Sequence, residues 1–157
     1  MKNLLVALLL ILVLPSAVLA ENGIAIKPTA KDKCPVCGMF VAKYPDFIAV
    51  ISFHDGSYVA FDGPKDMFKY VLQMEKYEPA RRNKHIRFAS VSEYYSMGPV
   101  DAFSAYYVVG SDVYGPMGKE LIPFDQEATA REFLKDHKGQ SILRFREVSL
   151  SLLKGLE

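Results

Sequence analysis

The segment FIAVISFHDGSYVAF at residues 47–61 decides the fold of this chain. Its first seven residues, 47–53, are rich in β-formers, and residues 58–61 are β-formers again. The residues between them, His54-Asp55-Gly56-Ser57, are typical of a tight turn. This order predicts a β-hairpin.

A helix and a third strand are expected after the hairpin. Asp62-Gly63-Pro64 supplies a cap-like residue and a proline, which are typical of a helix start. Apolar side chains then recur at helical spacing up to about Gln73, at Met67, Phe68, Val71 and Leu72. A charged connection follows, and Ile86 opens the next strand.

The second half of the chain repeats this order. A strand is expected at 105–109, and Phe124-Asp125 precedes a second helix as Phe61-Asp62 precedes the first, 63 residues earlier. Residues 86–92 also align with 143–149, sharing Arg, Phe, Val and Ser. We predict an α+β fold of two small ββαβ units, residues 21–95 and 96–157. Because neither unit can bury a core alone, they should pack as one globular body.

Residues 1–20 have the layout of a secretory signal peptide. One lysine precedes an uninterrupted apolar run that ends in small residues, so cleavage is expected after Ala20. The run is short for a bilayer span, and an uncleaved membrane anchor is the alternative. No cysteine ends the run to accept a lipid, so we expect a protein that is soluble in the periplasm after export.

The charge balance excludes nucleic acid as a partner. Residues 21–157 keep 18 of the 19 basic side chains and all 18 acidic ones, so the exported part has a net charge near zero. No stripe of lysine and arginine crosses it, and the cluster at residues 81–85 is typical of a solvated connection.

The two cysteines lie within four residues of each other, at Cys34 and Cys37. An exported protein meets an oxidising compartment, where cysteines usually form stabilising disulfides between distant segments. A bond between these two would close a very small loop and remove little chain entropy. The pair therefore indicates chemistry rather than a structural crosslink.

Three sulfur ligands can converge in the motif Cys34-Pro35-Val36-Cys37-Gly38-Met39. Two thiolates and a thioether favour copper(I), whereas zinc sites usually recruit four Cys or His ligands and seldom methionine. The histidines, at 54, 85 and 137, are isolated in sequence. A thioredoxin-like redox pair and an inert local disulfide are the alternatives, but the redox fold needs its pair at a helix start, and redox exchange gives Met39 no task.

A second unusual segment is Tyr114-Gly-Pro-Met-Gly-Lys-Glu-Leu-Ile-Pro-Phe124. It is a glycine-proline loop with one methionine, and it precedes the second helix. If the two units pack with pseudo-symmetry, Met117 should approach the cysteines of the first unit. Core packing is the alternative for Met117, and the more common role for a methionine such as Met97.

These two motifs together, with the helix expected from Asp125 to His137, resemble the NosL family of nitrous-oxide-reductase accessory proteins. The resemblance covers almost all of the chain after residue 20. It implies an exported copper(I)-binding protein of two ββαβ units, a fold likened to one domain of organomercurial lyase. It also implies that the metal ligands are Cys34, Cys37, Met39 and Met117.

The function expected from the sequence is therefore capture and hand-over of copper(I), without catalysis. The resemblance implies that the recipient is nitrous oxide reductase or its maturation machinery. Two other classes stay open. A thiol-disulfide oxidoreductase would show a redox couple without metal, and a metal-independent interaction domain would bind its partner with both cysteines changed to serine.

Overall fold

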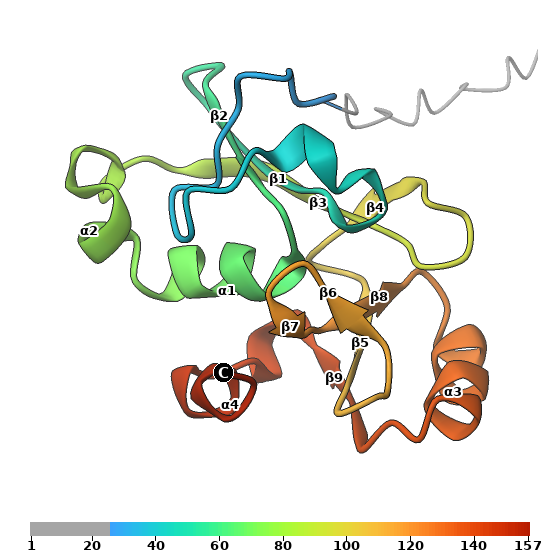
Figure 1. Cartoon of the computed structure of the whole chain (residues 1–157). Helices are drawn as coiled ribbons and strands as arrows, with labels where there is room; N and C mark the ends of the chain where they lie inside the picture. The colour runs from blue at the N-terminus through green and yellow to red at the C-terminus, as the bar shows by residue number, and fades with distance from the viewer. Residues whose placement is uncertain (1–25) are drawn as a thin grey trace, which may run out of the picture.

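Two antiparallel sheets, each with its own helix, form the frame of the computed structural model, which describes residues 26–157 (Figure 1). The predicted signal peptide, residues 1–20, lies outside these residues. Among the described residues, no helix combines the length and the apolar character needed to cross a bilayer.

The first sheet contains the predicted hairpin and has the strand order β2-β1-β3-β4. Helix α1 follows the hairpin and is separated from β3 by a short helix and a 3-10 turn. The bounds are β1 Ala49–Phe53, β2 Tyr58–Phe61, α1 Pro64–Leu72, α2 Met74–Tyr77, η3 Pro79–Arg81, β3 Ile86–Ser92 and β4 Pro99–Asp101. Strand β4 comes after the sequence boundary at residue 95, and it pairs with β3 of the first unit.

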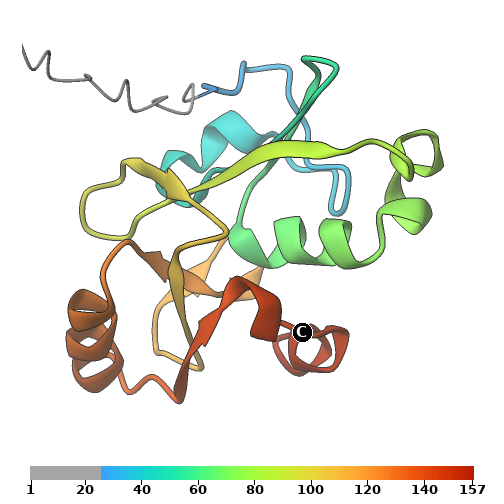
Figure 2. The ribbon, with the colours of Figure 1, turned by 180° about the vertical axis from the view of Figure 1, so that it is seen from behind.

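Strand β1 is buried along its whole length because both faces of the first sheet are covered. Helix α1 packs against β1 and β2, and the 3-10 turns η1 (Val41–Lys43) and η2 (Pro45–Phe47) lie on the other side (Figures 1 and 2). The strand predicted from residue 47 begins at Ala49, since Pro45 opens a 3-10 turn that continues to Phe47.

The second sheet has the order β8-β5-β9, which repeats the order β2-β1-β3. A two-stranded hairpin, β6–β7, is inserted between β5 and β8. The bounds are β5 Tyr106–Val109, β6 Tyr114–Gly115, β7 Gly118–Lys119, β8 Ile122–Phe124, α3 Glu127–Asp136, β9 Ser141–Arg144, η4 Phe145–Glu147 and α4 Leu150–Gly155. The α+β class and the repeated ββαβ order are confirmed.

One of the two sequence alignments between the units is confirmed and the other is wrong. Phe61 pairs with Ala49, and Phe124 pairs with Tyr106, so these two phenylalanines hold equivalent places. The alignment of residues 86–92 with 143–149 fails because β9 ends at Arg144. There the Arg144 N–H donates to Glu147 Oε2 at 2.6 Å, and the chain turns into η4.

The main hydrophobic core spans both units, so they form one body as expected. Phe68 of α1 packs edge-on against Tyr107 of β5, with ring centres 5.0 Å apart, and against Phe145 of η4 at 4.9 Å. Helix α4 packs beside α1 (Figure 2). A smaller core fills the space between α3 and the second sheet; its buried members are Val108, Ile122, Phe124, Ala130 and Phe133.

Candidate metal centre

A short loop, residues 33–41, holds the two cysteines in a turn closed by its own backbone. The Cys34 N–H donates to the Met39 carbonyl at 2.9 Å, and the Gly38 N–H donates to the Cys34 carbonyl at 2.8 Å. Gly38 has a φ of 79°, in the left-handed region that glycine adopts without a steric penalty. The cysteines therefore lie in a turn, unlike the helix start that a thioredoxin-like pair requires.

Two aspartates at the start of α1 complete a cluster with the cysteines. Asp62 directly follows β2, and Asp66 lies in the first turn of α1. The Cys37 thiol donates to Asp62 Oδ1 at 3.1 Å, and the Cys34 thiol donates to Asp66 Oδ2 at 3.4 Å. Both carboxylates are buried, and the N-terminal end of a helix favours negative charge near it.

The cluster is slightly wider than a metal site with an ion bound. One ligand atom from each of Cys34, Cys37, Asp62 and Asp66 lies within 4.8 Å of all the others. Ligands of a tetrahedral ion with bonds of about 2.0–2.3 Å are roughly 3.3–3.8 Å apart. A small inward movement of these side chains would therefore close them around one cation.

Both thiols are held in the neutral form at ordinary pH. Burial raises the pKa of Cys34 far above its usual value, and the carboxylates of Asp62 and Asp66 raise it further. Burial and the adjacent Asp62 carboxylate raise the pKa of Cys37 to about 12. The cluster can thus bind a cation only by releasing protons, because the thiolate is the form that ligates metal.

The two methionines predicted as ligands lie on segments next to this cluster. Met39 belongs to the cysteine loop and is half-buried. Met117 lies at the turn between β6 and β7, with 47% of its surface exposed. This turn reaches the start of α1, where Lys65 Nζ donates to the Met117 carbonyl at 2.7 Å (Figure 1). Lys65 stands between Asp62 and Asp66 in the sequence.

Two buried ionisable side chains, Lys65 and Glu120, hold the β6–β7 hairpin against α1. Lys65 Nζ also donates to the Lys119 carbonyl at 2.6 Å, and the Lys65 N–H donates to Glu120 Oε1 at the same distance. Glu120 lies so close to Gly63 that a Cβ there would be 2.3 Å from Glu120 Oε2. The absence of a side chain at Gly63 therefore makes room for this contact between the two units.

Asp62 and Asp66 are the members of the cluster that sequence reasoning missed. Asp62 was expected to cap α1, but Gly63 is the N-cap residue and no side chain caps that end. A pair of aspartates four residues apart across a helix start was the available signal. It is weak, because such spacings are frequent on solvent-exposed helices that bind nothing.

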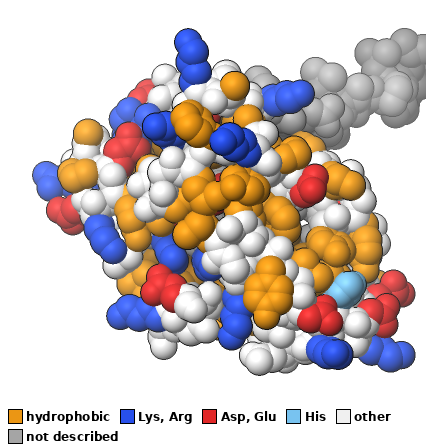
Figure 3. Space-filling view, viewed as in Figure 1, with side chains coloured by type: hydrophobic (Ala, Val, Ile, Leu, Met, Phe, Trp, Pro, Cys, Tyr) orange, Lys and Arg blue, Asp and Glu red, His pale blue; other side chains and the backbone are white. Residues whose placement is uncertain are grey.

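The surface around the cluster is apolar and open. Phe40, Tyr114 and Met117 are large hydrophobic side chains with more than a third of their surface exposed. Figure 3 shows hydrophobic side chains gathered over the centre of the face where the cysteine loop and the β6–β7 hairpin lie in Figure 1. A second protein could approach the cluster over this surface.

Two comparisons of the sequence with known proteins match the same family. The sequence model of the NosL family matches residues 25–153. The copper-binding lipoprotein NosL of Stutzerimonas stutzeri is 34% identical over 131 residues, which cover 78% of this chain and 65% of that relative. The chain thus matches slightly less than two thirds of that relative's length.

The fold has also been seen in a solved structure. The crystal structure of the copper chaperone NosL from Shewanella denitrificans superposes with a TM-score of 0.67. The match covers 81% of this chain and 96% of that one, at 22% sequence identity. At this identity, the likeness establishes a shared arrangement of helices and strands.

Proposed function

Because this chain belongs to the NosL family, we propose that it is an exported copper(I)-binding metallochaperone. Its role would be to deliver copper for the assembly of the copper centres of nitrous oxide reductase, either to that enzyme or to its maturation machinery. The observation that carries this proposal is the convergence of Cys34 and Cys37 with two buried carboxylates, in a loop that also contains Met39. The names of the relatives, a copper-binding lipoprotein and a copper chaperone, support it.

The proposed ligands of the copper(I) cargo are the sulfur atoms of Cys34, Cys37, Met39 and Met117. Copper(I) prefers thiolate and thioether donors, and these four sulfurs belong to two segments that both contact the start of α1. The carboxylates of Asp62 and Asp66 accept hydrogen bonds from the thiols and are placed to receive the thiol protons as the ion enters. Binding of one copper(I) by both thiolates moves two protons off the sulfurs, first to these carboxylates and then to solvent.

Release of the cargo follows from the few ligands that copper(I) requires. A site with two thiolates and weaker thioethers leaves room for a sulfur of the recipient to enter and replace one donor at a time. The apolar surface around the cluster supports direct contact during this exchange. This role is capture and hand-over, and it needs no catalytic step.

The redox alternative is less well supported by the site. A reactive cysteine in a thiol-disulfide oxidoreductase is activated by a lowered pKa, whereas burial and Asp62 raise the pKa of Cys37 to about 12.

The competing metal is zinc(II), because aspartate oxygens together with cysteine sulfurs are a donor set that zinc accepts. We propose copper(I) and a periplasmic location, with the exported chain beginning at Glu21.

Anaerobic competition against calibrated chelators for copper(I) and zinc(II) tests this function. We expect copper(I) to be held far more tightly than zinc(II), Cys37→Ser to abolish copper(I) retention, and Met117→Leu to weaken retention while keeping the fold. X-ray absorption at the copper edge should show sulfur neighbours. Equal or tighter binding of zinc(II) would reject the copper assignment, and unchanged copper(I) retention in Met117→Leu would remove Met117 from the ligand set.

A further inference from the structure

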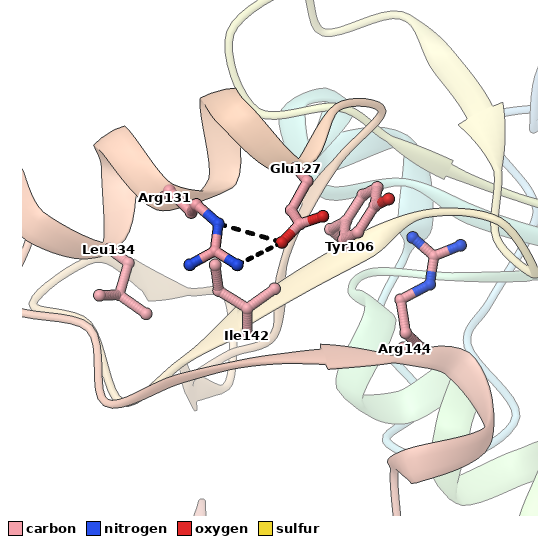
Figure 4. Close-up of a pocket in the computed structure, with 6 residues that line it drawn as sticks. All are labelled: Tyr106, Glu127, Arg131, Leu134, Ile142 and Arg144. Carbon is pink, nitrogen blue, oxygen red and sulfur yellow. Dashed lines mark hydrogen bonds and ion pairs between the residues drawn. The ribbon is translucent and has the colours of Figure 1, made fainter.

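A groove of about 580 Å³ lies in the second unit, away from the cysteine cluster (Figure 4). Helix α3 forms one wall, and strands β5 and β9 form the other. Its lining residues are Tyr106, Glu127, Arg131, Leu134, Ile142 and Arg144. None of them belongs to the candidate metal centre, so the groove requires a separate explanation.

The pleat of the second sheet explains why the groove exists. Tyr106 pairs with Arg144, and Val108 pairs with Ile142, so these four side chains share the face toward α3. Helix α3 covers Val108 and the strand β8 beyond it through the smaller core. It leaves the outer part of the face open beside β9, which is the edge strand of this sheet.

One guanidinium in the groove is held against an aromatic ring but has no acidic partner among residues 26–157. The Arg144 Cζ lies 3.8 Å above the centre of the Tyr106 ring, and its buried Nη1 has no hydrogen-bond partner among residues 26–157. No salt bridge found in the described residues includes Arg144. Arg131, by contrast, is neutralised by Glu127, whose Oε1 it contacts through Nε at 3.0 Å (Figure 4).

This arrangement favours a single carboxylate over a polyanion. The groove holds two arginines and one glutamate, so its excess charge is that of one guanidinium. A guanidinium stacked on an aromatic ring is oriented in advance, which favours planar recognition of a carboxylate through its remaining N–H groups. An acidic side chain in the groove would supply the countercharge that Arg144 lacks.

The first unit shows what can lie beside the equivalent strand. Val91 of β3 pairs with Ala49, as Arg144 of β9 pairs with Tyr106, so β9 is the counterpart of β3. On its outer side β3 carries the short strand β4, with Val91 paired to Val100. The corresponding side of β9 has no strand in the described part of the chain. An exposed edge strand is a template for pairing with another chain.

We propose that the groove beside β9 docks an extended acidic segment of a partner protein. The segment adds to β9 as a further strand, as β4 does to β3, and one of its carboxylates binds the Arg144 guanidinium. The inference goes beyond the proposed copper function, since the groove contains no residue of the metal cluster. Docking here leaves the cysteine loop free.

A synthetic peptide tests the proposal without knowledge of the natural partner. The probe is a capped heptapeptide, Thr-Val-Glu-Val-Glu-Val-Thr, whose glutamates lie on one face of a strand. It is titrated into ¹⁵N-labelled protein purified from the exporting host, and backbone amide shifts are followed. We expect shifts confined to β9, β5 and the start of α3, with at least about tenfold weaker binding when both glutamates are replaced by glutamine.

Two arginine variants make the test specific. Arg144→Gln should weaken binding at least about tenfold, as expected when a charged partner is lost. Arg146→Gln, an exposed arginine two residues away that does not line the groove, should leave it unchanged. Circular dichroism of both variants checks the fold, and Cys37→Ser protein should bind the peptide as the parent does, which separates this result from the copper proposal.

Four outcomes would overturn the proposal. Shifts that fall elsewhere place the peptide on another surface. Shifts at β9 that persist unchanged in Arg144→Gln show that Arg144 does not bind a carboxylate of the peptide. No shift at millimolar peptide shows that β9 does not accept a strand. Sodium acetate that reproduces the β9 shifts at the same concentration as the peptide shows a simple anion site without strand addition.

Discussion

Asp62 controls the reactivity of its neighbouring thiol, in addition to its place in the metal cluster. The Cys37 thiol donates a hydrogen bond to Asp62, and after burial this carboxylate is the strongest influence that raises the Cys37 pKa to about 12. A neutral thiol is a poor nucleophile. Metal-free protein should therefore react slowly with alkylating reagents, although part of the Cys37 side chain is accessible.

Asp62→Asn should accelerate alkylation of Cys37 by iodoacetamide. The substitution removes a negative charge next to the thiolate, and each unit by which the pKa falls raises the thiolate fraction about tenfold at a fixed pH below it. Mass spectrometry of the Cys37 peptide over time gives the rate. Asp46→Asn, an exposed aspartate on η2, is the control and should react as the parent does. An unchanged rate in Asp62→Asn would mean that burial alone holds the proton.

At the scale of elements, the contact of the β6–β7 hairpin with α1 makes stability depend on pH. Burial raises the pKa of Glu120 to about 8, although the N–H groups of Lys65 and Leu121 oppose the shift. The unfolded chain loses this proton near 4.5, so between about pH 4.5 and 8 the folded state binds more protons than the unfolded state. Stability contributed by this group is therefore complete below pH 4.5 and decreases as the pH rises toward 8.

Glu120→Gln should flatten this pH dependence. Glutamine keeps an acceptor for the two N–H groups and cannot ionise, so the decrease, at most about 1.4 kcal/mol per pH unit for one proton, disappears. Urea unfolding of metal-free protein at several pH values between 5 and 8 measures it. Glu132→Gln, on the exposed side of α3, should keep the slope of the parent. If Glu120→Gln also keeps the slope of the parent, other groups cause the pH dependence of stability.

At the scale of the whole molecule, the shared core should make the two units unfold together. Phe68 is buried in the first unit and touches Tyr107 and Phe145 of the second. Phe133 lies in the smaller core of the second unit. Both residues should therefore support the stability of the entire chain, because neither unit has a complete core of its own.

Phe68→Ala should destabilise the chain by about 3–5 kcal/mol, the usual effect of removing a buried phenylalanine. Two local probes test cooperativity: alkylation of Cys34 in the first unit and hydrogen exchange of the β5 amides in the second. Both should report the same denaturant midpoint. Phe133→Ala should also shift the two midpoints together. Separate midpoints would mean that the units are independent domains.

The hairpin and the repeat could be predicted from sequence because they depend on local chemistry. Turn residues between two β-rich runs place β2 at Tyr58–Phe61, as expected, and the Phe-Asp pairs mark equivalent strand ends. The alignment of residues 143–149 with strand β3 is wrong because four identical residues in the two segments do not hold equivalent places in the sheets. What ends β9 is a backbone hydrogen bond to the Glu147 side chain, which no periodicity records.

The candidate site could be predicted only where its residues are close in sequence. Cys34 and Cys37 form a motif, but their aspartate partners are respectively 32 and 25 residues further along the chain. Asp62 and Asp66 reach the thiols because the hairpin returns the chain to the cysteine loop before α1 begins. The sequence contains no local sign of that meeting, since aspartates at helix starts usually serve the helix itself.

Because the cluster combines residues from two distant segments, the stability of the folded protein should depend on whether a metal ion is bound. The cysteine loop closes through its own backbone, but the carboxylates join it only when the first unit is folded. A cation that needs groups from both the cysteine loop and a distant segment binds the folded chain alone, and at a free concentration 100 times its dissociation constant it adds about 2.7 kcal/mol of stability. The metal-bound protein should then resist proteases and heat better than the metal-free protein, which becomes the form most readily degraded once the metal is lost.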